Sequence, residues 1–445
     1  MGMRRSLCVV AGVIAGSWVA AGQQATPQGT GAPAGQAAPS QAQPTNLGSD
    51  ANGNPLRRAL KTGHVSNYDE GKVRSYTLPD PLVLASGKPV RDRQTWLRER
   101  RPEILRLYES EIYGRVPKKT PRVTWEVTET NPRARDGAAI MKKITGTVGS
   151  APDAPQIRLT LYTPADAKKK VPVILLVNFG GGPTPPPSAQ GRGGGGFPSD
   201  PPVAADIISR GWGYATVGYQ DIQPDRLNTF KQGVIGASLA PGQDQPAADE
   251  WGTISAWSWG VSRMIDYLET DRSVNAKQVA LFGHSRLGKT ALWATARDER
   301  IAAAFSSCSG EMGAALARRD WGETVDDMAQ NFPWQFAGNF QKWSGRWNEM
   351  PVDAHMLIAL SAPRPVFITG GTADQWADPM GMFKAAVAAG PVYRLLGKKD
   401  LGTTDLPPLD TPLVTGEIGW HYHTGGHTAT PADWTAFLEF LGKYF

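Results

Sequence analysis

A strand-to-helix turn at residues 279–294 constrains the fold more than any other part of the chain. Residues 279–282 form a short apolar run, typical of the end of a buried strand, and residues 290–294 continue with helical spacing. Gly283, His284 and Ser285 therefore lie on the turn between the two elements. A turn of this kind holds a serine hydroxyl clear of the backbone, so Ser285 is our candidate nucleophile.

The sequence of this turn differs from the usual pattern G-x-S-x-G. The second glycine is expected two residues after the serine, where this chain has Leu287, and it arrives one residue later as Gly288. The cations Arg286 and Lys289 lie in the same turn. The helix that follows would direct free N–H groups at negative charge developing next to Ser285. A structural serine that caps this helix is the alternative, and the flanking glycines favour catalysis.

Apolar runs and helical patterns alternate along the rest of the chain. Residues 171–178 form a continuous apolar run, as expected for a parallel strand covered on both faces. The alternation predicts an α/β-hydrolase fold, which is a three-layer αβα sandwich with a mostly parallel central sheet. The expected helices are 95–113, 203–210, 251–269, a segment ending near 296, and 434–444; the expected strands are 123–129, 139–147, 157–163, 171–178, 214–218, 278–282, 302–307, 366–369 and 392–396.

Three segments of different composition predict the domain organisation. Residues 1–22 carry Arg4 and Arg5, an apolar run and a small-residue site, so we expect a signal peptide and a secreted or periplasmic protein. Residues 23–67 begin with a long stretch of Gln, Ala, Pro, Gly, Thr and Ser, which is typical of a disordered linker. Residues 68–445 are long enough for one α/β-hydrolase catalytic domain.

Charge and cysteine content narrow the possible partners. The formal net charge is +6, and the basic residues are not gathered into one stripe, which argues against a nucleic-acid partner. The apolar run before residue 22 is short for a transmembrane span, so we expect no membrane partner. Cys8 would leave with the signal peptide, and Cys308 alone permits no intramolecular disulfide. We expect a monomer that uses no cofactor and no metal.

A nucleophilic serine needs a base, and the base needs an acid that orients it. In hydrolases of this fold the chain order is serine, acid, histidine, and the last two lie on loops after later strands. Asp374 follows the expected strand 366–369, and His427 precedes the final helix, so these two complete our candidate triad. Asp374 as a simple turn residue is the alternative.

Three histidines lie close together near the C-terminus, namely His421, His423 and His427. A zinc site made of all three is an alternative use, because His-x-His can chelate a metal from a strand. We see no acidic residue close by that would orient such ligands, and a metal would leave the serine turn without a role. His427 is therefore our candidate general base.

The two cations beside Ser285 point to stabilisation of an anion. The backbone N–H of Arg286 would form half of an oxyanion hole, and residues 178–181 could supply a second donor. The guanidinium of Arg286 would add positive charge, although an ordinary surface cation is an equal alternative. Lys289 lies one helical turn after Ser285, where it could reach substrate oxygens. An insertion at residues 220–249 could wall the pocket, and Trp334 could line it.

Taken together, these motifs resemble a bacterial glucuronoyl esterase of carbohydrate esterase family 15. The resemblance extends roughly from Tyr76 to the C-terminus. The combination of the Ser-Arg-x-Gly-Lys turn with the later Asp-x-Trp is specific. The motifs that carry the resemblance are Gly283-His-Ser-Arg-Leu-Gly-Lys289, Trp321-Gly-Glu-Thr324, Ala362-Pro-Arg-Pro365, Asp374-Gln-Trp-Ala-Asp-Pro379, and His427 before Asp433-Trp434.

The resemblance implies an activity and further site residues. Members cleave the ester between glucuronic acid, often 4-O-methylated and borne on xylan, and an alcohol thought to belong to lignin. It implies that Ser285, His427 and Arg286 act as nucleophile, base and oxyanion-stabilising side chain, and that Lys289, Glu323 and Trp376 hold the sugar hydroxyls. Glucuronoxylan and lignin–carbohydrate esters would be the substrates. The alternatives are an exported acetyl xylan esterase or other carbohydrate esterase, and a module that only binds polysaccharide.

One position departs from the family pattern. Many relatives carry the triad acid as a glutamate soon after the strand that follows the nucleophile helix, in a Glu-Ser-Gly context, and this chain has Cys308-Ser309-Gly310 there. A thiol cannot orient and stabilise an imidazolium as a carboxylate does. We therefore assign the acid to Asp374, with Glu311 as the second choice.

Overall fold

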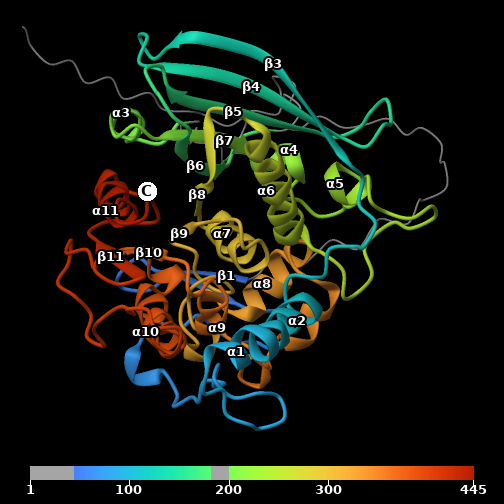
Figure 1. The fold of residues 1–445 in the computed structure, drawn as a ribbon. Coiled ribbons are helices and arrows are strands. Elements are labelled where there is room, and N and C mark those ends of the chain that lie inside the picture. The colour runs from blue at the N-terminus through green and yellow to red at the C-terminus, as the bar shows by residue number, and fades with distance from the viewer. Residues whose placement is uncertain (1–44, 182–199) are drawn as a thin grey trace, which may run out of the picture. The chain divides into compact units, whose positions relative to one another are not determined.

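The computed structural model describes residues 45–181 and 200–445, which belong to one compact unit, Gln43–Phe445. Its centre is a nine-stranded sheet in the order β11-β10-β9-β8-β6-β7-β5-β4-β3 (Figure 1). The strands are β3 (Val123–Ala134), β4 (Ala139–Val148), β5 (Gln156–Pro164), β6 (Val171–Asn178), β7 (Gly213–Gly218), β8 (Val274–His284), β9 (Ala303–Ser307), β10 (Val366–Gly371) and β11 (Ile418–His423).

The sheet has an antiparallel part and a parallel part. Strands β3, β4, β5 and β7 pair antiparallel, whereas β7, β6, β8, β9, β10 and β11 pair parallel. The chain enters the parallel part at β6, crosses to β7 and returns beside β6 as β8. This confirms the expected α/β-hydrolase fold with a mostly parallel sheet. Because β8, β10 and β11 are parallel, the segments that follow them leave the same edge of the sheet.

The two faces of the sheet are buried by different helices, because successive side chains of a strand point in opposite directions. In β6, Ile174 and Leu176 pack with α3 and α11, whereas Val173, Leu175 and Val177 pack on the opposite face. The first face is covered by α3 (Ala204–Ser209) and α11 (Pro431–Leu441); the second is covered by α2 (Arg101–Glu111), α6 (Thr253–Thr270), α7 (Arg286–Arg297), α9 (Ala354–Ala359) and α10 (Pro379–Leu395).

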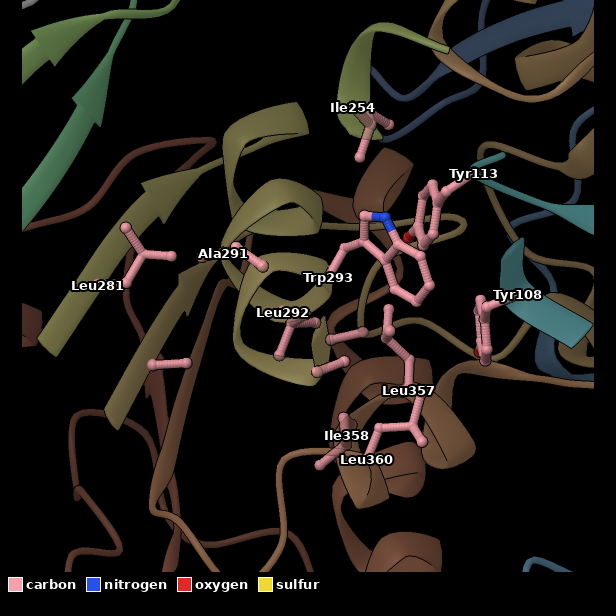
Figure 2. Packing of buried hydrophobic residues seen from close by; sticks show 14 of the residues in the cluster. Tyr108, Tyr113, Ile254, Leu281, Ala291, Leu292, Trp293, Leu357, Ile358 and Leu360 are labelled. Atoms are coloured by element: carbon pink, nitrogen blue, oxygen red, sulfur yellow. The ribbon is translucent and has the colours of Figure 1, made fainter. Parts of the chain in front are cut away.

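Helix α7, which begins directly after Ser285, is buried on almost all sides. Its residue Trp293 is fully buried and lies beside Tyr113 and Tyr108, with ring centroids 5.1 and 5.9 Å away (Figure 2). The indole N–H of Trp293 donates to the Ser255 hydroxyl at 2.7 Å. Dense packing of this kind leaves little room for the helix to shift. The core therefore fixes the position of the candidate nucleophile.

Most expected elements lie where the sequence predicts them, and one expected strand is wrong. Residues 392–396 lie in and after the last turn of α10, so they are helical where a strand was expected. The short apolar run fits either structure, and the alanine-rich residues that precede it carry the helix onward. The last strand is β11 instead, which lies far later and is rich in His, Trp and Tyr.

The N-terminal part also differs from the prediction. Residues 45–67 were expected to belong to a disordered linker, but β1 (Thr45–Ser49) pairs antiparallel with β2 (Pro55–Arg58). Polar groups hold this segment, because the Asp50 carboxylate accepts hydrogen bonds from the backbone of Asn52 and Asn54. A prediction of disorder from composition rests on low apolar content, so it does not detect order that comes from hydrogen bonds. Residues 23–44 and the expected signal peptide lie outside the described residues, and the described helices include none long and apolar enough to cross a membrane.

The remaining short helical elements lie before α2 or in the segments that follow β7 and β9. Among them, the insertion at residues 220–249 begins within a short helix and contains one other. Their bounds are α1 (Arg93–Thr95), a π-helical turn (Trp96–Arg100) that joins α1 to α2, α4 (Tyr219–Ile222), α5 (Gly233–Gly236) and α8 (Val325–Asn331).

Candidate active site

Ser285 occupies the sharp turn between β8 and α7. Its φ and ψ angles are 58° and −127°, a conformation that non-glycine residues rarely adopt. A hydrogen bond of 2.8 Å from its backbone N–H to the Ser307 carbonyl ties the turn to β9. Strain held in this way by the surrounding structure is typical of functional sites.

The glycines of the turn are explained by contacts. A Cβ atom on Gly283 would lie 1.9 Å from the carbonyl oxygen of Leu287, so no side chain fits there. A Cβ on Gly288 would lie 2.9 Å from the Cβ of Ser309, in the loop after β9. The second glycine is therefore needed where α7 passes this loop, one residue later than in the usual pattern.

Asp374 and His427 meet in the loops that follow β10 and β11. The Nδ1 atom of His427 lies 2.7 Å from Oδ2 of Asp374. The Asp374 side chain is 5% exposed and that of His427 is 43% exposed, so the carboxylate is buried while the imidazole faces the solvent side. A buried acid behind an accessible base is the arrangement that general-base catalysis requires. Glu311, the second choice for the acid, makes no such contact among the described residues.

A second histidine packs against the candidate base. The ring centroids of His284 and His427 are 4.6 Å apart. Burial, together with the charge of His427, lowers the pKa of His284 to about 3. His284 therefore stays neutral at neutral pH and adds no positive charge next to His427.

A buried carboxylate holds the other two C-terminal histidines. The Nδ1 atoms of His421 and His423 lie 2.7 and 3.1 Å from Oδ1 of Asp433. Burial alone would raise the pKa of Asp433, but the hydrogen bonds from both histidines lower it to about 2. The expectation that no acid lies near these histidines is wrong. Their rings face Asp433, whereas His427 faces Asp374, so the three do not converge as zinc ligands would.

Cys308 lies at the position for which the family resemblance implies a glutamate. It is 1% exposed, and its Sγ atom lies 3.5 Å from the Thr428 carbonyl oxygen. Burial, reinforced by the charge of Asp374, raises the pKa of the thiol well above its usual value. Possible ligand atoms of Cys308, Asp374 and His427 all lie within 4.8 Å of one another. The neutral thiol thus lies beside the acid–base pair.

Arg286 is held by an acid that the sequence analysis did not select. Its guanidinium forms an ion pair with Asp225, which lies in the insertion at residues 220–249. The Asp225 side chain is 2% exposed and also accepts hydrogen bonds from Trp334 Nε1 at 2.6 Å and Gln335 Nε2 at 2.8 Å. The insertion therefore fixes both Arg286 and Trp334. Several acids occur in the insertion, and nothing in the sequence distinguishes Asp225 from the others.

Replacing Asp225 by asparagine should lower kcat about 10-fold or more, because Arg286 would lose the charged partner that orients it towards the oxyanion. Steady-state kinetics on an activated ester would measure this. Asp244→Asn is the matched control, since Asp244 lies in the same insertion and pairs with Lys231 on the surface. Equal kcat values in the two variants would contradict the orienting role.

Lys289 lies one helical turn after Ser285, whereas Glu323 and Trp376 lie in two loops that are joined to each other. Lys289 is only 4% exposed, and burial lowers its pKa, which the negative charge of Glu323 partly offsets. The backbone N–H of Glu323 donates to the Trp376 carbonyl at 2.9 Å. This bond joins the loop before α8 to the loop after β10. The two predicted sugar-holding loops are thus directly connected.

The fold and the site together define a serine hydrolase of the α/β-hydrolase class. A candidate nucleophile on a strained turn, with an Asp–His pair in the loops after later parallel strands, is the arrangement typical of that class. Helix α7 begins at Arg286, directly after Ser285, so the free backbone N–H groups of its first turn could stabilise an oxyanion formed there.

Comparison with known proteins identifies the family. The family profile "Glucuronyl esterase, fungi" matches residues 246–397. A glucuronoyl esterase from Solibacter usitatus is 42% identical, covers 84% of this chain and 99% of its own, and superposes with a TM-score of 0.78. Carbohydrate esterase MZ0003, from an unknown prokaryotic organism, is 40% identical over 85% of this chain and 92% of its own length. The CE15 glucuronoyl esterase from Teredinibacter turnerae is 34% identical, covering 87% and 95% of the two chains, with a TM-score of 0.78.

The chain belongs to the glucuronoyl esterases of carbohydrate esterase family 15, and it is a carboxylic ester hydrolase. The resemblance inferred from the sequence motifs is confirmed.

Proposed function

We propose that this enzyme hydrolyses the ester between an alcohol and the glucuronic acid of glucuronoxylan. The glucuronic acid is 4-O-methylated or unmethylated. Family membership supports the reaction. The observation that carries the choice of the acid part is the set of polar groups beside Ser285, namely the Arg286–Asp225 pair, the buried Lys289 and Glu323. An ester with a small apolar acyl group has no hydroxyls for Lys289 and Glu323 to bind, whereas a sugar acid has several.

Each side chain has a defined role in the proposed reaction. His427, oriented by Asp374, removes the proton of Ser285 as its oxygen attacks the ester carbonyl. The backbone N–H and guanidinium of Arg286 stabilise the oxyanion of the tetrahedral intermediate. His427 then protonates the departing alcohol, which leaves a glucuronoyl ester on Ser285. Water activated by the same histidine releases the acid.

The proposed biological substrate is a lignin–carbohydrate ester borne on xylan. Curated fungal relatives are named 4-O-methyl-glucuronoyl methylesterases, and the one from Phanerochaete carnosa is 29% identical over 73% of this chain. We propose that the alcohol of the substrate comes from lignin, that the enzyme acts as a monomer and that it works outside the cytoplasm, consistent with the signal-like N-terminus. Glu323, Trp376 and Lys289 bind the sugar, and Trp334 lines the pocket.

One comparison of substrates tests this function. We expect kcat/KM on a benzyl glucuronate ester to exceed that on an aryl acetate by at least about 10-fold, because only the first substrate engages the sugar-binding groups. Preference for the acetate would instead support the acetyl xylan esterase alternative. The purified protein would bind glucuronoxylan without hydrolysing either ester if it were only a binding module.

A further inference from the structure

The segment from residue 45 to residue 72, here called the N-terminal segment, is bound to the loops of the sugar-binding side. Most of its hydrogen bonds and ion pairs to the rest of the described chain reach one short stretch, residues 319–330, which contains Glu323. These contacts are Leu60 N–H to Gln330 Oε1 at 2.8 Å, the Thr62 hydroxyl to Asp326, His64 to Asp320 at 3.0 Å, Gly322 N–H to the Asn67 carbonyl at 2.9 Å, and Arg319 to both carboxylate oxygens of Glu70 at 2.7 and 2.6 Å.

Arg57 is the residue of this segment that reaches Trp376. The centre of its guanidinium lies 4.6 Å from the centroid of the Trp376 ring. Its backbone is fixed on both sides, by pairing with Asn46 and by hydrogen bonds to Ser66 at 3.0 and 3.1 Å. The guanidinium therefore reaches the Trp376 ring from a backbone that is held in place.

Trp376 needs support of this kind because it is not enclosed. The ring is half-buried, in a short 3₁₀ turn (Gln375–Ala377) directly after Asp374. One backbone bond, from Glu323 N–H to the Trp376 carbonyl, joins it to the next loop, but that bond does not restrict rotation of the side chain. A cation placed over an indole face is the strongest form of cation–π contact in proteins. Arg57 therefore limits the orientations of the ring.

The charge of Arg57 also acts on the carboxylate of Asp327, at the start of α8. Burial and the charge of Glu323 raise the pKa of Asp327 to about 6, and Arg57 opposes that rise. Arg57 thus lies on the same side of the site as Glu323 and Trp376.

We propose that Arg57 is a positioning residue for the sugar: it fixes the ring of Trp376 so that the indole meets the glucuronoyl group in one orientation. This inference rests on the proposed function. The N-terminal segment, which composition predicts to be part of a linker, would then form one side of the sugar-binding site. Arg57 acts through Trp376 and takes no part in bond making or breaking.

The test is a set of variants measured on two substrates. Arg57→Met keeps the length of the side chain and removes the cation, Arg57→Lys keeps the charge without the planar group, and Arg58→Met is the matched control, since Arg58 is the exposed neighbour in the same strand. We expect Arg57→Met to raise KM for benzyl glucuronate about 5- to 20-fold, the range for loss of one cation–π contact, with kcat changed less. Arg57→Lys should recover part of the loss. KM for an aryl acetate, and all values for Arg58→Met, should stay within about 2-fold.

A double variant separates positioning from direct contact with the sugar. If Arg57 acts through Trp376, Arg57→Met should have almost no further effect in a Trp376→Ala background. Additive effects would overturn the proposal, as would equal losses on both substrates or an unchanged KM in Arg57→Met. If the wild-type enzyme does not hydrolyse the glucuronate ester, the proposed function and this inference are both wrong. If the wild type is active and KM is unchanged in Arg57→Met, this inference alone is wrong.

Discussion

Asp374→Ala should lower kcat on a glucuronate ester by about 10³- to 10⁴-fold, the loss typical of a triad that has lost its acid. The carboxylate lies 2.7 Å from His427 Nδ1, so it holds the imidazole in the tautomer that can accept the serine proton. The His427 side chain is 43% exposed, so loss of this hydrogen bond would let the imidazole rotate. Steady-state kinetics would measure the loss, with the unfolding temperature as the check that the fold persists.

A second substitution makes this experiment sharper. Cys308 lies within reach of both Asp374 and His427, in the place where many relatives carry a glutamate. Adding Cys308→Glu to the Asp374→Ala enzyme supplies a carboxylate from that side and should restore part of kcat. Near-native activity in Asp374→Ala alone would show that another residue is the triad acid, and Glu311 would be the next candidate. Cys308→Ala should leave kcat close to the wild-type value.

Asp433→Asn should lower the free energy of unfolding by about 3–5 kcal/mol, which is the usual cost of breaking a buried charged pair. The Asp433 side chain is fully buried. Besides His421 and His423, it accepts hydrogen bonds from the backbone N–H and hydroxyl of Thr430 at 2.7 and 2.8 Å, and so caps α11. Denaturant unfolding would measure the loss. Thr430→Ala removes only the cap and should cost about 1 kcal/mol.

The pH dependence of this loss follows from two pKa shifts. The pKa of Asp433 falls from 3.8 to about 2, so its contribution is complete above 3.8 and is lost as the pH falls through 2. Burial opposes the charged form of His423, but Asp433 outweighs it and raises the pKa above 6.5. The contribution of His423 is therefore complete below 6.5 and is lost as the pH rises through its raised pKa. The difference between wild type and Asp433→Asn should be largest between pH 3.8 and 6.5; a flat profile would contradict the pairing.

The sequence predicts the parts of this molecule that depend on local pattern. The continuous apolar run at β6 is typical of a buried strand. The glycines around Ser285 and the helical spacing that follows them are typical of a strand-to-helix turn. The chain order of a triad and the ends of parallel strands led to Asp374 and His427, and the structure brings these two side chains together. The capping box of Thr430 and Asp433 at the start of α11 was not predicted, although its spacing is present in the sequence.

The residues that sequence reasoning missed depend on contacts between distant segments. Asp225 was one of several acids in an irregular insertion, and only folding places it against Arg286. Arg57 lies in a segment whose composition predicts disorder. The segment is ordered mainly by polar contacts to residues 319–330, and apolar burial contributes little. The helix at residues 392–396 was mistaken for a strand because a run of five residues, four of them apolar, fits both structures.

The closing elements of the sheet also decide when activity can first appear during synthesis. The nucleophile emerges well before its base, because His427 follows β11 and the Asp433 carboxylate that holds this strand lies later still, in α11. A parallel pair such as β10 and β11 cannot form from neighbouring residues, and pairings of that kind form slowly. The candidate triad is complete only when β11 and α11 have been synthesised and packed. A chain that lacks these last elements should therefore be inactive, although it contains Ser285.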